Sequence, residues 1–481
     1  MSLFTVGQRV HIVAVGGAGM SAIARILMAK GCIVSGSDVA ASTRLSALKA
    51  EGVDAYVGHD AQAFALRNPD ALIHSTAIKD DNPEMQAAQA AGLPILSRAD
   101  ALVELLRERD VIEVVGTHGK TTTASMLAVC AIELGLDPSY LVGSEIAQTQ
   151  TNARWAAPLM VVEGDESDAS GFRLHPRVLI VTNVEADHLD FWHTEDELDA
   201  AFAQFAATVP DDGYIVVCAD DEGARKVGAA AQLAGRRVVT YGSSADADVR
   251  MVELGFGSRG PRVRIDGAIT HEQVELQVPG LHNLRNALAV MTTGHVLGWD
   301  PSKTAEALRG FQSTRRRFET IATVEGVEVI DDYAHHPTAV AATIDAAQRI
   351  AHSRREAGDP ARVIAVCQPY RWYRTAANTT EYAVALDLAD EVVLLDVYGP
   401  GETPITGAGP MAIATLMHTS QQYVPSKEAA VALLAAMSRS GDIILTLGGE
   451  DVRNVAHALA SALSGDAQHT RVPARGHGAA T

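Results

Sequence analysis

Cysteines and long apolar runs are both scarce in this chain of 481 residues. The four cysteines, Cys32, Cys130, Cys218 and Cys367, stand far apart and form no Cys-x-x-Cys pair. This spacing argues against a zinc site or a disulfide framework and predicts buried thiols in a reducing compartment. No uninterrupted apolar run approaches the ~20 residues that span a bilayer, and the first residues show no basic leader ahead of an apolar cleavage region. We therefore expect a cytoplasmic protein without membrane insertion.

Positive charge is scarce as well, because 39 Lys and Arg stand against 59 Asp and Glu, for a formal net charge of -20. Such a field repels polyanions, so we expect no nucleic-acid partner. A small anionic substrate must then be held by helix N-termini and a few placed Lys or Arg side chains. The composition, 47% hydrophobic and 20% charged, is otherwise that of a globular protein, and the length suits three domains.

Three cycles of short apolar strands and helical stretches follow one another along the chain. The first spans residues 10–109, the second begins with the strand 111–115, and the third begins with the strand 327–331. We predict an α/β chain of three domains. They are an N-terminal Rossmann-like domain (1–109), a central P-loop ATPase-like domain with a parallel or mixed sheet (110–318) and a C-terminal Rossmann-like domain (319–464). The Gly- and Ala-rich residues 465–481 are predicted to be a disordered tail.

A glycine-rich loop follows the first strand of the central domain, with the sequence Gly116-Thr117-His118-Gly119-Lys120-Thr121-Thr122. In such loops backbone N–H groups close around phosphate oxygens, and the following helix N-terminus adds positive potential. Lys120 would bridge the outer phosphates and Thr121 would ligate magnesium. A strict Walker loop has glycine where Val114 stands here, so an ordinary glycine-rich turn is the alternative. Because strand, turn, Gly-Lys-Thr and helix occur in order, we favour an enzyme that uses ATP.

Acidic residues follow two further strands of the central domain, in the runs 163–168 and 183–188. Ligands of open α/β sheets bind at the carboxyl ends of the strands, and magnesium on a triphosphate prefers carboxylate oxygens. Considered alone, each acidic run is typical of a solvent-exposed turn. Beside the phosphate loop, the two runs together predict a magnesium site.

The N-terminal turn has the pattern G-x-G-x-x-A, and an acidic residue, Asp38, follows about 20 residues later. Standing alone, this pattern suggests an NAD-dependent oxidoreductase. Physically it indicates only that a pyrophosphate can approach a helix N-terminus, which a UDP-sugar satisfies equally well. Both readings stay open on these residues alone.

The combination of motifs resembles the Mur ligases of bacterial peptidoglycan synthesis, from about Val10 to Leu463. The resemblance implies an ATP-dependent ligase that joins the lactyl carboxylate of UDP-N-acetylmuramate to L-alanine through an acyl phosphate, with ATP and Mg²⁺ bound. A related ligase that attaches a preformed tripeptide to the same UDP-sugar in wall recycling shares the phosphate motifs and is the alternative. A nucleotide-binding regulator without turnover is a further possibility. The oligomeric state is not predicted.

The resemblance also implies site residues, motif by motif. The implied catalytic residues are Lys120, Glu163, His188, His335 and Arg374. The implied metal ligands are Thr121, Glu163 and His188. The implied ATP-binding residues are Gly116, Thr117, His118, Gly119, Lys120, Thr121, Thr122, His282, Asn286, Arg317 and Asp332. The implied UDP-sugar and amino-acid contacts are Gly17, Ala18, Gly19, Met20, Ser21, Asp38, Ser75, Thr76, Arg371 and Arg374.

Some residues depart from the family pattern or have a plainer reading. Tyr370 stands where the family usually has His, and Ser313 where it usually has Gly. Arg371 and Arg374 could be surface charges, and His335 an ordinary capping or core residue. Several Mur ligases carry a carbamylated lysine in the central domain, yet this chain has no lysine between positions 120 and 226. We therefore expect the metal to be held without such a lysine.

Overall fold

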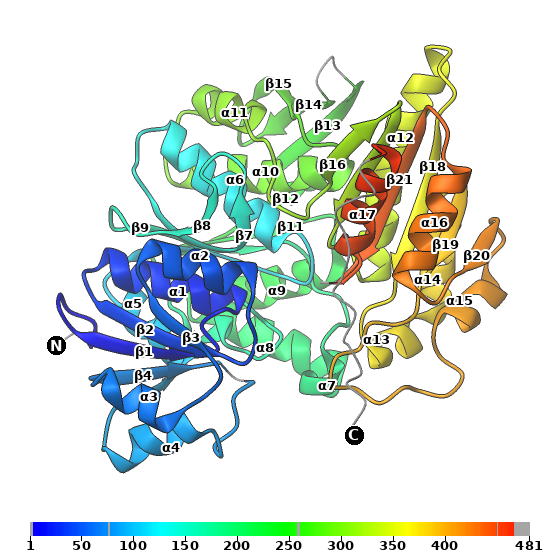
Figure 1. Ribbon diagram of the computed structural model, residues 1–481. Helices are drawn as coiled ribbons and strands as arrows, with labels where there is room; N and C mark the ends of the chain where they lie inside the picture. Colours follow the sequence, from blue (N-terminus) through cyan, green and yellow to red (C-terminus); the bar gives the residue numbers. More distant parts are fainter. Residues whose placement is uncertain (1–2, 76, 257–259, 450, 466–481) are drawn as a thin grey trace, which may run out of the picture. The chain divides into compact units, whose positions relative to one another are not determined.

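The computed structural model describes residues 3–75, 77–256, 260–449 and 451–465. The predicted tail therefore lies, apart from its first residue, outside the described residues. Three sheets with flanking helices make up the described chain, which confirms the predicted three-domain α/β class (Figure 1). The chain forms two compact units. The first ends at Arg315 and the second begins at Arg316, and residues 279–281 also belong to the second unit. The N-terminal and central sheets belong to the first unit.

The N-terminal sheet has the order β3-β2-β1-β4-β5, and all of its pairs are parallel. Apolar residues of α1, α2 and α5 form one core layer, while α3 and α4 contribute to a second, smaller one. The strands are β1 (Arg9–Val13), β2 (Ile33–Asp38), β3 (Asp54–Val57), β4 (Ala71–His74) and β5 (Ile95–Ser97). The helices are α1 (Ala18–Ala29), α2 (Thr43–Glu51), α3 (Ala61–Leu66), α4 (Pro83–Ala90) and α5 (Arg98–Leu106).

Helix starts in this domain follow from local capping chemistry. The Ser42 and Asp60 side chains accept hydrogen bonds from the first turns of α2 and α3, and Asn82 caps α4 ahead of a proline at its first position. Ser97 and Asp100 form a reciprocal capping box at α5. Helix α1 differs, because its first turn has no side-chain cap. Its first N–H groups are therefore not satisfied by a capping side chain.

The central sheet is mixed, with the order β15-β14-β13-β12-β11-β10-β6-β9-β7-β8. The run from β13 to β7 is parallel, and antiparallel strands continue it at both edges. The strands are β6 (Asp110–Val115), β7 (Ser139–Ile146), β8 (Thr151–Arg154), β9 (Leu159–Glu163), β10 (Val178–Val181), β11 (Tyr214–Cys218), β12 (Val238–Gly242), β13 (Val249–Phe256), β14 (Pro261–Gly267) and β15 (His271–Glu275). The helices are α6 (Lys120–Glu133), the 3₁₀ turn η1 (Gly171–Arg173), α7 (Leu189–Trp192), α8 (Glu195–Ala207), α9 (Glu222–Leu233), α10 (Leu281–Val296) and α11 (Pro301–Arg309).

The C-terminal sheet has the order β16-β17-β21-β18-β19-β20, and only the β16–β17 pair is antiparallel. Helices α12, α14 and α15 contribute to one core layer, and α16 and α17 to the other. The strands are β16 (Glu319–Val324), β17 (Val327–Asp332), β18 (Arg362–Gln368), β19 (Glu391–Leu394), β20 (Gln421–Tyr423) and β21 (Asp442–Gly448). The helices are α12 (Pro337–Glu356), α13 (Trp372–Ala377), α14 (Thr379–Leu386), α15 (Pro410–Leu416), α16 (Lys427–Met437) and α17 (Arg453–Leu463).

The N-terminal and central domains share one apolar core. Leu141 and Met160 of the central sheet belong to the same buried cluster as Ile23 of α1 and Leu105 of α5. This shared core holds the glycine turn before α1 beside the carboxyl end of β9. Among the described residues, no helix is both long and apolar enough to cross a membrane.

Candidate active site

The N-terminal glycine turn is pinned by Asp38, whose Oδ2 accepts a hydrogen bond from the Gly16 N–H at 2.9 Å. Gly17 is the N-cap of α1, and the predicted residues Ala18, Gly19, Met20 and Ser21 form its first turn. The Ser21 hydroxyl is used inside the helix, donating to the Ala18 carbonyl at 2.9 Å. Asp38 thus fixes the backbone of the turn.

The second predicted substrate loop follows β4. Ser75 closes a turn there, because its carbonyl accepts from the Ile78 N–H at 3.0 Å and its hydroxyl accepts from the Ala77 N–H at 3.4 Å. Thr76 lies outside the described residues.

The glycines of the phosphate loop are required by space and backbone conformation. Gly116 has φ +129°, and a Cβ there would lie 2.3 Å from Thr182 Oγ1. Gly119 has φ +82° and is the N-cap of α6, which has no side-chain cap. Both positions favour glycine strongly, and the uncapped helix start leaves N–H groups to bind phosphate oxygens.

The loop is held open by residues that follow β10. The Asn183 side chain accepts from the His118 N–H at 2.7 Å and donates to the His118 carbonyl at 2.9 Å. Thr182 Oγ1 donates to the same carbonyl at 2.6 Å, and Thr117 Oγ1 accepts from the Glu185 N–H at 2.9 Å. These bonds preorganise the backbone around the phosphate position.

Lys120 points into its own loop. Its Nζ donates to the Gly116 carbonyl at 2.5 Å and to Glu166 Oε1 at 2.7 Å. Burial by itself would lower the pKa of Lys120, but the charges of Glu166, Glu163 and Asp165 hold that pKa above its ordinary value. Burial also raises the pKa of Glu166 to about 7. Lys120 is therefore a cation that acidic neighbours neutralise.

Two of the three predicted metal ligands are in contact. Thr121 Oγ1 donates to Glu163 Oε1 at 2.7 Å, and Glu163 Oε2 accepts from the Gly143 N–H at 2.6 Å. His188 is the N-cap of the short α7 in left-handed conformation, and its backbone N–H donates to Asp187 Oδ1 at 2.8 Å. The structure therefore brings Thr121 and Glu163 together, whereas His188 stands on the loop after β10, at the start of α7.

Two further predicted ATP-binding residues, His282 and Asn286, lie on the first turns of α10. Asn286 Nδ2 donates to Asn283 Oδ1 at 3.3 Å, and its Oδ1 lies only 2.7 Å from where a Cβ on Gly119 would stand. Asn286 therefore packs directly against the phosphate loop. His282, one turn earlier, is half-buried.

The predicted nucleotide contacts of the second unit are neighbours. Asp332 accepts hydrogen bonds from the N–H groups of Phe318 and Ala334, both at 2.7 Å. Burial raises the pKa of Asp332, while the Arg317 charge lowers it. The Arg317 guanidinium lies 5.5 Å from the centre of the Tyr333 ring.

The residues predicted to contact the amino-acid substrate form an aromatic and cationic cluster in the second unit. The His335 ring lies 5.2 Å from that of Tyr370, and the Arg374 guanidinium lies 5.8 Å from the Tyr370 ring. Arg374 is only 2% exposed, so it is not a surface charge. Arg371 is partly exposed and pairs with Glu402 at 3.3 Å.

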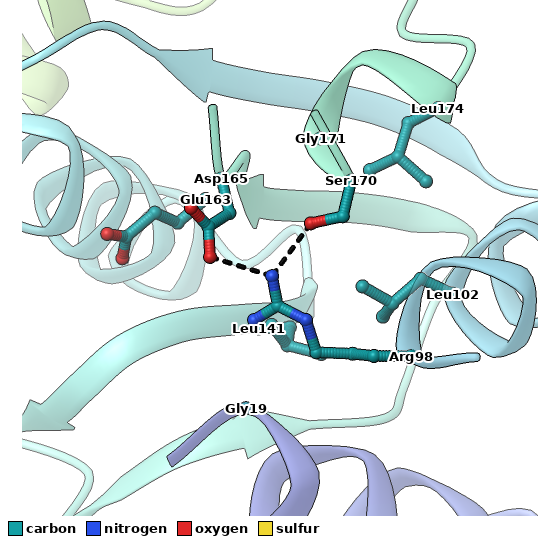
Figure 2. A pocket seen from close by; sticks show the side chains of 9 residues that line it. All are labelled: Gly19, Arg98, Leu102, Leu141, Glu163, Asp165, Ser170, Gly171 and Leu174. Atoms are coloured by element: carbon teal, nitrogen blue, oxygen red, sulfur yellow. Dashed lines mark hydrogen bonds and ion pairs between the residues drawn. The ribbon is translucent and has the colours of Figure 1, made fainter. Parts of the chain in front are cut away.

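Three residues at the site were given no individual role by the sequence. Glu166 and Asn183 lie within the two acidic runs that predicted the magnesium site. Arg98 had no such signal, because it begins a helix far from any motif. Its Nη2 reaches Asp165 in the acidic loop after β9 at 2.7 Å (Figure 2).

Family models match nearly the whole chain. Residues 9–110 match the model described as Mur ligase family, catalytic domain. Residues 114–294 match the Mur ligase middle domain, and residues 316–449 match the Mur ligase, glutamate ligase domain.

Curated relatives match with similar coverage. The UDP-N-acetylmuramate–L-alanine ligase of Acidothermus cellulolyticus is 43% identical over 451 residues, which are 92% of each chain. The protein of the same description from Mycolicibacterium smegmatis is 40% identical over 464 residues, 95% of each chain.

Solved structures match as well. A UDP-N-acetylmuramate-alanine ligase from Thermotoga maritima has a TM-score of 0.79 at 26% identity, over 95% of this chain and 99% of that one. A murein peptide ligase from Psychrobacter arcticus has a TM-score of 0.68 at 24% identity, which indicates a shared fold.

Proposed function

Because this chain belongs to the Mur ligase family, we propose that it forms an amide between the lactyl carboxylate of UDP-N-acetylmuramate and the amino group of L-alanine, with ATP as the phosphoryl donor. The observation that carries the proposal is the phosphate loop with Lys120 at its centre and the Thr121–Glu163 pair beside it. Relatives of that activity at about 40% identity over nearly the full chain support the choice of substrates.

The reaction needs activation because a carboxylate is a poor acyl donor. The lactyl carboxylate oxygen attacks the γ-phosphorus of ATP, and ADP leaves with an acyl phosphate formed. The amine of L-alanine then attacks the acyl carbon, loses a proton, and inorganic phosphate leaves. No protein nucleophile is required, so catalysis comes from positioning and charge neutralisation.

Lys120 is the residue that changes partner during this cycle. In the structure its ammonium donates to the Gly116 carbonyl and to Glu166. With ATP bound, phosphate oxygens replace these acceptors and Lys120 neutralises the charge on the transferred phosphoryl group. Glu166, whose pKa lies at about 7, then takes up a proton more readily because its cationic partner has moved.

The residues present fit ATP and magnesium. Gly116 and Gly119 have φ values of +129° and +82°, which favour glycine, and the start of α6 has no side-chain cap. Thr121 and Glu163 offer the hydroxyl and carboxylate oxygens that Mg²⁺ prefers, and His188 is the third proposed ligand. Mg²⁺ would supply charge neutralisation at the phosphates.

In this proposal the second unit binds the amino-acid substrate. Arg374 is buried beside Tyr370 and His335, where its planar guanidinium can bind the α-carboxylate of L-alanine through two hydrogen bonds. Arg371 adds a second cation near the same ring. We place the reaction in the cytoplasm because ATP is its substrate and the four cysteines are buried free thiols.

The alternatives are less well supported. The curated relatives that are 40–43% identical over nearly the full chain are described as L-alanine ligases, which favours that activity over a tripeptide ligase of wall recycling. An oxidoreductase built on the first glycine turn would leave Lys120 and Glu163 without a role.

Phosphate release tests the proposal. The purified chain is incubated with ATP, Mg²⁺, UDP-N-acetylmuramate and either L-alanine, glycine, L-serine or a tripeptide. We expect the highest kcat/KM with L-alanine, and a fall of at least about 100-fold in Lys120→Ala. Lys226→Ala, which removes an exposed lysine paired with Asp199, is the matched control and should keep full turnover. Preference for the tripeptide, or normal turnover in Lys120→Ala, would contradict the assignment.

A further inference from the structure

The Trp192 side chain links two segments that carry proposed metal ligands. Its indole Nε1 donates to the Glu166 carbonyl at 3.0 Å, in the acidic loop 163–168 that follows β9. Trp192 is itself the last residue of α7, the short helix whose N-cap is His188. One hydrogen bond therefore joins the loop that begins with Glu163 to the segment that begins with His188.

The acidic loop is held in place independently of this bond. The Gly164 N–H donates to the Val114 carbonyl of β6 at 2.9 Å, and the Asp165 carbonyl accepts from the Gly171 N–H at 2.9 Å. Glu166 follows these two anchored residues directly. Its carbonyl is therefore a fixed acceptor against which a neighbouring segment can be aligned.

Helix α7, in contrast, has little of its own to fix it. It spans only four residues, which is too short for a helix to be stable by itself, and residues of positive φ flank it, His188 (φ 55°) and His193 (φ 61°). Among the described residues, the Trp192 indole makes the only side-chain hydrogen bond from residues 189–193. The position of α7 therefore depends on that bond and on the packing of its aromatic side chains.

The aromatic packing holds α7 without selecting one position for it. The Trp192 ring lies 5.8 Å from the Phe172 ring of η1, and Phe172 stacks on Phe205 of α8 at 5.1 Å. Apolar contacts are non-directional, so they tolerate small shifts of the helix. A hydrogen bond weakens steeply when its geometry changes, so the indole N–H selects a single position.

His188 moves with Trp192, because the His188 carbonyl accepts from the Trp192 backbone N–H at 3.0 Å. From this geometry we propose that Trp192 is a positioning residue, whose indole N–H holds His188 at a set distance from Glu163 and thereby strengthens binding of the divalent cation that accompanies the nucleotide. The inference rests on the proposed function, in which these two side chains are metal ligands. Trp192 acts through His188 and needs no contact with the cation or the nucleotide.

Binding of Mn²⁺ to the full chain with ADP, without UDP-N-acetylmuramate or L-alanine, tests this role. Mn²⁺ is detected by electron paramagnetic resonance and suits the same oxygen ligands as Mg²⁺. We expect Trp192→Phe to raise the Kd of Mn²⁺ about 3- to 10-fold, the range of one neutral hydrogen bond, because the phenyl ring keeps the packing but lacks the N–H. The Kd of ADP in EDTA should change less than about 2-fold, since the phosphate loop is not altered.

The matched control is Trp299→Phe, in the same unit. Trp299 lies against Gly294 of α10, and its indole makes no hydrogen bond among the residues that the structure describes. This variant makes the same chemical change without removing a hydrogen bond. The Kd of Mn²⁺ should therefore stay within about 2-fold of wild type.

Steady-state kinetics give a second readout. With ATP and both other substrates saturating, Trp192→Phe should raise the Mg²⁺ concentration for half-maximal turnover about 3- to 10-fold, while kcat at saturating Mg²⁺ stays within about 2-fold of wild type. Recovery by excess Mg²⁺ indicates weakened binding of the cation, because a general loss of packing would lower kcat at every Mg²⁺ concentration.

The other outcomes are distinct. Wild-type Mn²⁺ affinity in Trp192→Phe, with a loss only in Trp192→Ala, would overturn the proposal in favour of packing alone. Equal effects of Trp192→Phe and Trp299→Phe would overturn it as well. A parallel loss of ADP affinity in EDTA would overturn it in favour of an effect on the phosphate loop.

If Trp192→Phe does not fold, replacement of Trp192 by benzothienylalanine carries the same test, because sulfur takes the place of the indole N–H in a ring system of the same shape. Unchanged Mn²⁺ affinity in that protein would overturn the proposal. A wild-type chain that binds neither ADP nor Mn²⁺ with ADP would instead overturn the proposed function itself.

Discussion

Glu113 is fully buried in the central strand β6, between Val162 of β9 and Leu179 of β10. Neither of its carboxyl oxygens has a hydrogen-bond partner among the described residues. A Cβ on Gly164 would lie 2.3 Å from Glu113 Oε1, so the carboxyl group is packed tightly beneath the start of the acidic loop. Burial raises the pKa of Glu113 well above its ordinary value of 4.5. The folded protein therefore keeps a proton that the unfolded chain releases.

The sign of the pH effect follows from this proton count. Above pH 4.5 the unfolded chain binds fewer protons than the folded one, so the free energy of unfolding falls as pH rises. The fall is about 1.4 kcal/mol for each pH unit and stops at the pKa of the folded protein. For a domain of 150–250 residues, 1 kcal/mol corresponds to about 2–4 °C in Tm, so one pH unit should lower the wild-type Tm by about 3–6 °C through Glu113 alone.

Scanning calorimetry from pH 5 to pH 8, at one scan rate, measures the effect. Glu113→Gln keeps the shape and removes the titration, so the Tm difference between this variant and wild type should grow with pH. Glu113→Met also removes two unpaired polar atoms, each of which costs about 1–3 kcal/mol when buried, so it should be the more stable variant at pH 7. Parallel wild-type and Glu113→Gln curves over the whole range would refute the reasoning, since the carboxyl group would then titrate alike in both states.

Three further predictions concern the reaction. Gly119→Ala should raise KM for ATP at least about 10-fold, because the Cβ would lie 2.7 Å from Asn286 Oδ1. Gly135→Ala is the control and should leave KM unchanged, since Gly135 has a similar positive φ with nothing within 4 Å of its Cβ position; equal KM values for both variants would exclude the steric reason. Arg374→Ala should raise KM for L-alanine more than 10-fold and KM for ATP much less, since the guanidinium is proposed to bind the α-carboxylate; steady-state kinetics check this, and equal effects would move Arg374 to the nucleotide. Activity in degassed buffer should not respond to added bicarbonate, because no lysine stands between positions 120 and 226 to be carbamylated; a reversible several-fold activation would contradict the metal site proposed above.

The fold class was predictable from sequence because its signals are local. The predicted strands 111–115 and 327–331 lie within β6 and β17 of the structure, since short runs of β-branched and apolar residues suit buried strands. The start of α6 at Lys120 followed from the glycines before it. The antiparallel strands β14 and β15 were not predicted, because their alternation of charged and apolar residues is short and irregular. The domain boundaries near residues 109 and 318 stay predictions.

The sequence by itself determined which residues could bind phosphate, because glycines and the Gly-Lys-Thr run act through their own backbone and the next helix. Only the tertiary structure decided their partners. Lys120 meets Glu166 across 46 positions, Thr121 meets Glu163 across 42, and Arg98 meets Asp165 across 67. The register of parallel strands brings such distant loops to one edge of a sheet, and the core shared by two domains brings the start of α5 to the same edge. Neither the register of the strands nor the shared core produces a periodic pattern in the sequence.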